Sequence, residues 1–183
     1  FCDSNIIMTL IDIKKYDLDI DIELRYANTN NITGKKIFLE KKCLLIKEAA
    51  DKLFLASKIA KDFNCKLKIF DAYRPKYVQE TLWNFSPNAD FLTDPAKGSP
   101  HTRGIAVDLT LIKNMEELEM GTDFDDFTEK AFHLSKNVPL RVRKNRALLL
   151  SIMTLAGFDF YHKEWWHYQL FQPKKYPLIN KIS

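Results

Sequence analysis

Two short stretches of this sequence place metal-binding and acid–base side chains close together. In the first, His101 stands seven residues before Asp108, with a glycine bend between them. In the second, Glu164 stands three residues before His167. Two histidines and one aspartate form a three-ligand set for zinc that leaves a fourth position for water. Glu164 is then the base beside that water, so the spacing predicts a site for metal-assisted hydrolysis.

The residues that follow Gly104 predict the strand that positions Asp108. Large apolar side chains alternate there with smaller or polar ones, which is typical of a strand buried on one face. Asp108 is expected on the opposite face, where a carboxylate is costly unless it is paired or coordinated. Glycine at position 104 lets the backbone bend sharply, which allows His101 to approach the same metal ion.

Glu164 and His167 lie in an aromatic, strand-favouring run from Phe158 to Tyr168. Residues three apart point to opposite faces of a regular strand. Glu164 is therefore expected at a strand entrance or a bulge, or else the segment forms a helical turn. The strand entrance is favoured, because the neighbouring tryptophans and tyrosine suit a sheet.

A lone histidine or aspartate is more often a structural residue than a ligand, so the interpretation rests on the combination of the four residues above. The remaining histidines are His133 and His162, and they have no comparable partners. His162 lies two residues before Glu164, which leaves an indirect supporting role open for it.

Both stretches match the pattern of a known family. They read Ser-x-His-x-x-Gly-x-Ala-x-Asp and Glu-Trp-Trp-His, and together they resemble the zinc D-alanyl-D-alanine dipeptidases, the VanX type of peptidase family M15. Other stretches match in the same order, so the resemblance covers nearly the whole chain. It implies one zinc ion per chain, held by His101, Asp108 and His167, and hydrolysis of D-Ala-D-Ala to two D-alanines. Spacing alone stops at metal-assisted hydrolysis.

A second catalytic residue follows from the motif Asp-Ala-Tyr-Arg-Pro at residues 71–75. Pro75 ends a predicted strand just after Arg74, which leaves the guanidinium at the end of that strand. Surface arginines are common, so a structural role stays open on the residues alone. In the family that the chain resembles, the matching arginine stabilises negative charge on the scissile carbonyl oxygen. A permanently charged, planar donor suits that task.

The resemblance also implies three substrate-binding residues. Tyr26 matches a family tyrosine that helps to hold the free amine of the substrate, although it can equally anchor a loop. Asp125 ends a Met-Gly-x-x-Phe-Asp match and is expected to pair with the ammonium group of the dipeptide. The alternative is that this acidic stretch is only a solvent-exposed run of charged residues. A buried carboxylate there favours a free amino terminus over an acylated one. Ser99 matches a serine near the substrate, or else is a plain loop residue.

The remaining segments predict an α+β scaffold. We expect an antiparallel sheet that carries the metal ligands, with helices packed against it, similar to hedgehog and D,D-peptidase domains. Apolar residues recur at helical spacing in 47–63 and 145–156, and residues 77–85 predict a further helix. Residues 66–70 predict a short strand. The basic run 141–146 is interpreted as the solvated face of a helix and not as a nucleic-acid patch.

Length and composition predict one globular domain that spans residues 1–183. With 46% hydrophobic and 28% charged residues, the chain is not of the disordered class. The net charge of +4 is mild and no nucleic-acid motif accompanies it. No apolar run is long enough to span a membrane. The expected partner is a small dipeptide, and no pattern predicts an oligomeric state.

The cysteines bear on location. Cys2, Cys43 and Cys65 are odd in number and lack a C-x-x-C pairing, so they indicate neither a disulfide framework nor a thiolate zinc site. This favours a reducing compartment, and the cytoplasm is the expected location. The chain begins with Phe1, which leaves removal of a signal segment and a periplasmic location as the alternative.

Two rival functions are compatible with the same ligand set. A D,D-carboxypeptidase or an L,D-endopeptidase uses a similar His/Asp/His site on longer cell-wall peptides. A non-catalytic, zinc-stabilised binding module, as in hedgehog signalling domains, is the rival from a different class. Glu164, Arg74 and Asp125 argue against the module, because a structural zinc ion needs none of them. Wall recycling, nutrient salvage and glycopeptide resistance all use dipeptidase chemistry, so the sequence does not select one of these roles.

Overall fold

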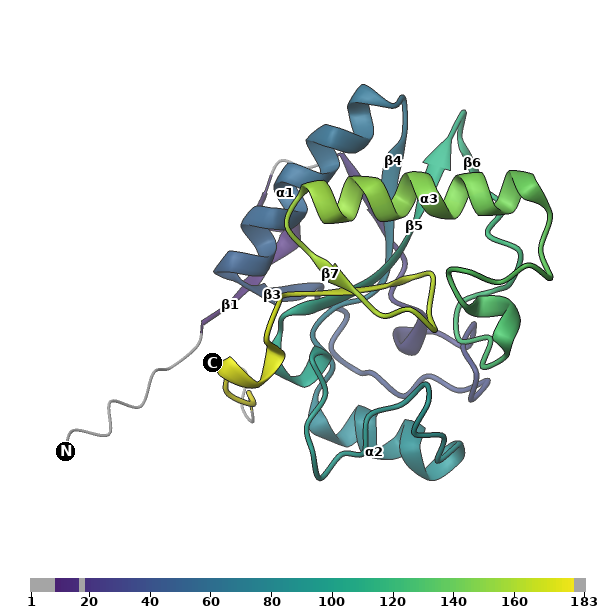
Figure 1. Ribbon diagram of the computed structural model, residues 1–183. Helices are drawn as coiled ribbons and strands as arrows, with labels where there is room; N and C mark the ends of the chain where they lie inside the picture. The colour runs from purple at the N-terminus through teal and green to yellow at the C-terminus, as the bar shows by residue number, and fades with distance from the viewer. Residues whose placement is uncertain (1–8, 17–18, 180–183) are drawn as a thin grey trace.

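The computed structural model describes residues 9–16 and 19–179. A twisted sheet crosses the middle of the molecule, with two long helices on one side of it in the view of Figure 1 and a shorter helix on the other. The long helices α1 (Lys47–Asp62) and α3 (Leu140–Leu155) pack against each other, and the shorter one is α2 (Lys76–Phe85). The fold is therefore α+β, as predicted. Within the described ranges, no helix has the length and apolar character to cross a membrane.

The main sheet is mixed. In spatial order it consists of β2 (Ile20–Ile22), β4 (Lys66–Asp71), β5 (Ala106–Lys113), β8 (His167–Gln169) and β7 (Asp159–Phe160), and β6 (Glu116–Glu117) also pairs with β5. The strands β2 and β4 are parallel, while the other pairs are antiparallel. The prediction of an antiparallel sheet is therefore wrong at this edge. The chain between β2 and β4 contains α1, and parallel pairing requires such a long crossover.

A second, two-stranded sheet lies beside the first. It pairs β1 (Leu10–Asp12) with β3 (Leu44–Ile46) in antiparallel fashion. Strand β3 leads directly into α1, and its three residues are buried. The short apolar stretches of residues 6–22 predict extended structure. Residues 10–12 and 20–22 are strands, whereas Ile13–Lys15 form a 3-10 helix, so the prediction is wrong there; residues 6–8 and 17–18 fall outside the described residues.

Helix α1 forms where apolar side chains recur at helical spacing, and it covers the predicted segment. Its buried residues are Ala49, Ala50, Leu53, Ala56 and Ala60. The helix ends one residue before the predicted Phe63. Asn64 then takes a left-handed conformation, with φ of 53°. Asparagine tolerates this conformation better than most residues, so it turns the chain towards β4.

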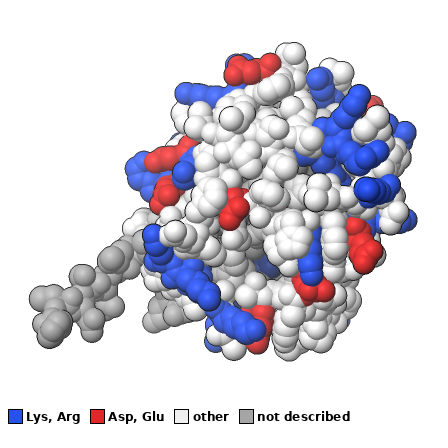
Figure 2. Space-filling view, viewed as in Figure 1, with Lys and Arg blue, Asp and Glu red and all other residues white. Residues whose placement is uncertain are grey.

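Helix α3 begins at Leu140, five residues before the predicted start at Asn145. Pro139 precedes its first residue, and the fixed φ of proline suits the entry to a helix. The basic run 141–146 therefore lies inside the helix. Figure 2 shows lysine and arginine side chains gathered on the face of the molecule around the start of α3. Gly157 follows the helix with φ of 92°, a left-handed conformation that suits the residue after a helix end and is typical of glycine.

Arg146 contradicts the prediction of a fully solvated basic face. Its side chain is 1% exposed. The guanidinium donates hydrogen bonds to the backbone carbonyl oxygens of Met120, Lys130 and Phe132. Arg146 therefore ties α3 to the two loops that carry these carbonyl groups, and its charge has a structural use.

Strand β5 runs through the centre of the sheet and is buried on both faces. The large apolar residues predicted to face the core are fully buried, namely Ile105, Val107, Leu109 and Leu111. On the opposite face Asp108 and Thr110 are buried as well. The alternation predicted a strand with only one buried face, because sequence does not show what covers the other. A buried carboxylate needs partners, and those of Asp108 define the site.

Candidate active site

Three side chains from distant parts of the chain meet at one point, as predicted. Nε2 of His101 lies 3.2 Å from Oδ2 of Asp108 and 3.2 Å from Nδ1 of His167. Nδ1 of His167 lies 3.0 Å from Oδ1 of Asp108. All three residues are buried, and their candidate ligand atoms lie within 4.8 Å of one another. The group is therefore a candidate metal site.

The sheet fixes two of these three residues, and a turn supplies the third. Asp108 of β5 and His167 of β8 are direct partners in an antiparallel pair. His101 is not on the sheet, contrary to the prediction that the sheet carries all the ligands. It begins a 3-10 helix, His101–Arg103, which ends at Gly104 with φ of 67°. The left-handed bend at this glycine returns the chain into β5, so the predicted role of Gly104 is confirmed.

The hydrogen bonds of the two imidazoles determine which nitrogens face the centre. Nδ1 of His101 lies 2.7 Å from the carbonyl oxygen of Ala72, and Nε2 of His167 lies 3.0 Å from Oε1 of Gln169. A backbone carbonyl oxygen only accepts, so Nδ1 of His101 carries a ring proton and Nε2 of His101 presents a lone pair. Nδ1 of His167 faces that lone pair and also Oδ1 of Asp108, which only accepts, so a proton or a metal ion must lie between these atoms. Two imidazoles and a carboxylate in this arrangement fit a zinc-type ion.

Glu164 lies beside the three candidate ligands. Its Oε2 is 3.9 Å from Nδ1 of His167. Burial raises the pKa of Glu164 to about 8, which brings this carboxyl into the range useful for proton transfer near neutral pH. The residue lies in the turn before β8, where the His167 N–H donates to the Glu164 carbonyl oxygen. Glu164 therefore precedes the strand and does not enter it: Trp165 and Trp166, which were expected to belong to the sheet, form a turn, and β8 begins only at His167.

Arg74 is buried and held on three sides. Nε donates to Oδ2 of Asp71 at 2.8 Å, and Nη1 donates to Oε1 of Gln79 at 2.9 Å. Nη2 points at Oδ2 of Asp108 at 3.4 Å. The guanidinium also lies over the ring of Tyr26, 4.9 Å from its centroid. These contacts fix a positive charge beside the candidate metal site.

Asp125 and Tyr26 form one unit, although 99 residues separate them. The Tyr26 hydroxyl donates to the Asp125 carboxylate, 2.9 Å and 3.0 Å from its two oxygens. Burial raises the pKa of Asp125 to about 8. The backbone of Asp125 is left-handed, with φ of 62°, a strained conformation that is found more often at functional positions. Asp125 lines the cavity described below, whereas Tyr26 stands behind it.

Ser99 also reaches the site. It is buried, and its Oγ accepts a hydrogen bond from the His101 backbone N–H at 3.1 Å. Ser99 therefore caps the turn that presents His101, in addition to lining the cavity. His133 and His162 do not line this cavity; the His133 ring packs edge-on against Phe160 and Tyr168.

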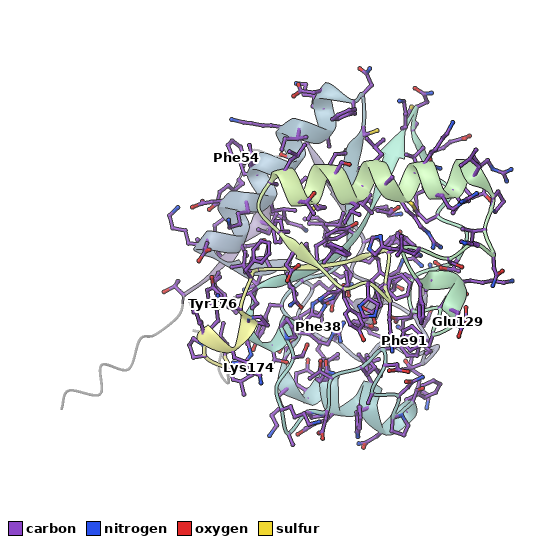
Figure 3. The ribbon with its side chains drawn as sticks, in the orientation of Figure 1. Phe38, Phe54, Phe91, Glu129, Lys174 and Tyr176 are labelled. Atoms are coloured by element: carbon purple, nitrogen blue, oxygen red, sulfur yellow. The ribbon has the colours of Figure 1, made fainter. Side chains whose placement is uncertain are left out.

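A cavity of about 270 Å³ opens at these side chains. Its functional lining consists of Arg74, Ser99, His101, Asp108, Asp125, Glu164 and His167. The segment 89–93 forms another part of the wall, and its Phe91 lies between the sheet and α2 (Figure 3). Phe91 stacks on Phe127, with ring centroids 4.9 Å apart. The volume falls just below the range of drug-sized pockets, so the cavity suits a small ligand.

Three supporting residues were not predicted from the sequence. Asp71 and Gln79 hold Arg74, and Gln169 holds His167. Asp71 stands in the same motif as Arg74, and Gln169 is two residues from His167 on one strand and therefore on the same face. Those two signals were available. Gln79 carried none, because its role depends on where α2 lies.

Comparisons with known proteins identify the family of the chain. The peptidase family described as D-ala-D-ala dipeptidase (Peptidase_M15) matches residues 7–181. The chain is 41% identical over 171 residues to the D-alanyl-D-alanine dipeptidase of Escherichia coli K12, covering 93% of this chain and 89% of that protein. It is 32% identical over 177 residues to the Enterococcus faecium protein of the same name, covering 85% and 87%. The chain therefore belongs to the D-ala-D-ala dipeptidase family of metallopeptidases and is a dipeptidase.

Proposed function

We propose that this enzyme hydrolyses D-Ala-D-Ala to two D-alanines with one zinc ion held by His101, Asp108 and His167. The observation that carries the proposal is the shared cavity. It joins the candidate metal site, a buried base and a buried carboxyl that faces the same space. When bound, zinc lowers the pKa of a water molecule to about 7 and polarises the peptide carbonyl.

Glu164 is the proton carrier of the reaction. It takes a proton from the water that attacks the carbonyl carbon, where a new C–O bond forms. It then delivers a proton to the nitrogen of the leaving D-alanine, and the C–N bond breaks. Its burial and its position 3.9 Å from Nδ1 of His167 support this role.

Arg74 stabilises the negative charge that develops on the scissile carbonyl oxygen. Its guanidinium is already fixed by Asp71 and Gln79, so little reorganisation is needed when that charge appears. A fixed donor of this kind stabilises the transition state more than the substrate.

Asp125 receives the free amine of the dipeptide. Its carboxyl is buried in the cavity wall, and Tyr26 supports it from behind. Asp125 forms no ion pair with the described residues, so an ammonium group supplies a charge partner, whereas an acetylated amine does not. Ser99 also lines the cavity and holds the turn of His101 through its Oγ.

The decisive experiment is an assay of D-alanine release from D-Ala-D-Ala, with and without added zinc. We expect release that a chelator abolishes and zinc restores. N-acetyl-D-Ala-D-Ala is the matched control substrate, and we expect no cleavage of it. Cleavage of the blocked peptide alone would identify a carboxypeptidase or an endopeptidase. Loss of fold stability on chelation, with no activity under any condition, would identify a structural zinc module.

A further inference from the structure

Each imidazole of the candidate metal site is anchored on the side that faces away from Asp108. The anchor of His101 is the backbone carbonyl of Ala72, at 2.7 Å. The anchor of His167 is a side chain, the amide of Gln169, with Oε1 3.0 Å from Nε2. Substitution of the Ala72 side chain leaves the backbone carbonyl in place, whereas the hydrogen bond to His167 depends on the side chain of Gln169.

The backbone that carries Gln169 is fixed on both sides. Strand β8 lies between β5 and β7, and Gln169 is the direct partner of Ala106 on one side and of Asp159 on the other. Gln169 follows His167 by two residues, so both side chains extend from the same face of β8. The side-chain amide of Gln169 can therefore reach the imidazole of His167 along one face of the strand. Gln169 also lines the cavity.

We propose that Gln169 is a positioning residue for His167. Its amide oxygen accepts the proton on Nε2, which leaves Nδ1 as the nitrogen directed at the metal ion. The inference rests on the proposed function, because it assumes that His167 is a metal ligand. Partners of this kind orient the ring and raise its basicity, and their loss typically weakens metal binding about 10- to 100-fold.

The test compares the zinc affinity of Gln169→Leu and Gln169→Glu with that of the parent. Leucine removes the acceptor at similar volume, and glutamate keeps an acceptor at the same reach. The dissociation constant is measured on the whole protein by competition with a chromophoric chelator. We expect Gln169→Leu to bind zinc about 10- to 100-fold more weakly, and Gln169→Glu to bind at least as tightly as the parent.

Two controls separate positioning from a general structural effect. Thr93→Val alters another cavity-lining residue, whose side chain has no hydrogen bond to the three candidate ligands within the described residues, and we expect parental zinc affinity. The unfolding temperature of each variant is also measured with excess chelator. We expect the metal-free values to agree, so that only the increase produced by zinc is smaller in Gln169→Leu.

The outcomes distinguish this inference from the proposed function. A parent protein that binds no zinc contradicts both. A parent that binds zinc and releases D-alanine, together with a Gln169→Leu variant of equal affinity, overturns the positioning role alone. If Gln169→Glu binds zinc as weakly as Gln169→Leu does, the positioning role is also overturned, because the loss of affinity would then not come from the loss of the acceptor.

Discussion

The carboxylate of Asp108 and the imidazole of His167 face each other across a paired antiparallel register, with Oδ1 3.0 Å from Nδ1. Their separation is therefore set by the central sheet and not by a loop. His101 completes the group from a turn whose shape depends on Gly104. The sheet thus fixes Asp108 and His167, whereas a local change in the turn can displace His101.

Replacing Glu164 with glutamine tests the assigned base. The amide keeps the shape of the side chain but cannot accept the proton, and we expect kcat to fall by about 10²- to 10⁴-fold. Zinc content should stay at the parental level, because Glu164 is not one of the candidate ligands. Steady-state D-alanine release and metal analysis on the same preparation check this. Unchanged turnover would show that the base is another group.

Replacing Arg74 with lysine tests the stabilisation of the carbonyl oxygen. Lysine keeps a positive charge but loses the planar contacts with Asp71 and Gln79. We expect kcat to fall by about 10²- to 10³-fold with little change in KM, since the interaction is made mainly in the transition state. Arg141→Lys on the exposed surface is the control and should behave as the parent. A change confined to KM would indicate that Arg74 binds the substrate instead.

Gln79→Leu gives a graded test of the same arginine. Arg74 keeps its contact with Asp71 but loses the partner of Nη1, and the segment 89–93 loses the hydrogen bond from Gln79 Nε2 to the Thr93 carbonyl oxygen. We expect kcat to fall about tenfold, less than for Arg74→Lys. Equal losses in the two variants would mean that Gln79 acts on the substrate wall and not through the guanidinium.

Gly104→Ala tests the turn that presents His101. A Cβ atom at this position would lie 2.7 Å from Cδ2 of Leu10, and φ is 67°. We expect a loss of unfolding free energy beyond the about 1–3 kcal/mol of a left-handed alanine, together with weaker zinc binding. Gly34→Ala is the matched control, because its φ is 63° and, apart from its chain neighbours, no atom of the described residues lies within 4 Å of the added Cβ. Chemical denaturation and chelator competition measure both effects, and equal losses in the two variants would exclude a role for the contact.

The sequence predicted the residues of the candidate site better than the residues that hold them in place. His101, Asp108, Glu164 and His167 stand in compact motifs, and these four side chains meet in the structure. Gln169 has only its two-residue spacing from His167 as a signal, and Gln79 has none. An amide becomes informative only when the packing of α2 and the pairing of β8 bring it to a charged or metal-binding side chain.

Local periodicity likewise predicted the elements, but long-range pairing decided their arrangement. The helix at 47–62 follows from apolar spacing alone. The parallel pairing of β2 with β4 and the burial of Arg146 depend on segments far away in the chain, so no local pattern contains them. The second face of β5 is covered by such segments as well, which is why the alternation predicted only one buried face.

Asp125 predicts a pH dependence of stability. Its pKa is about 8 in the folded protein because of burial, against about 4 in an unfolded chain. Between these values the folded state holds a proton that the unfolded state releases. The contribution of this carboxyl to stability is therefore full below about pH 4 and is lost as the pH rises through about 8. Glu164, with a pKa raised to about 8, acts in the same direction.

Asp125→Asn should remove one of these two contributions, because an amide does not titrate and can still accept a hydrogen bond from Tyr26. We expect the unfolding free energy of the metal-free variant to fall less steeply than that of the parent between pH 5 and pH 8. Urea denaturation in excess chelator at several pH values measures the two slopes. Tyr26→Phe, which keeps the carboxyl, should retain a steep fall. Parallel slopes for parent and Asp125→Asn would mean that this carboxyl is already ionised in the folded protein.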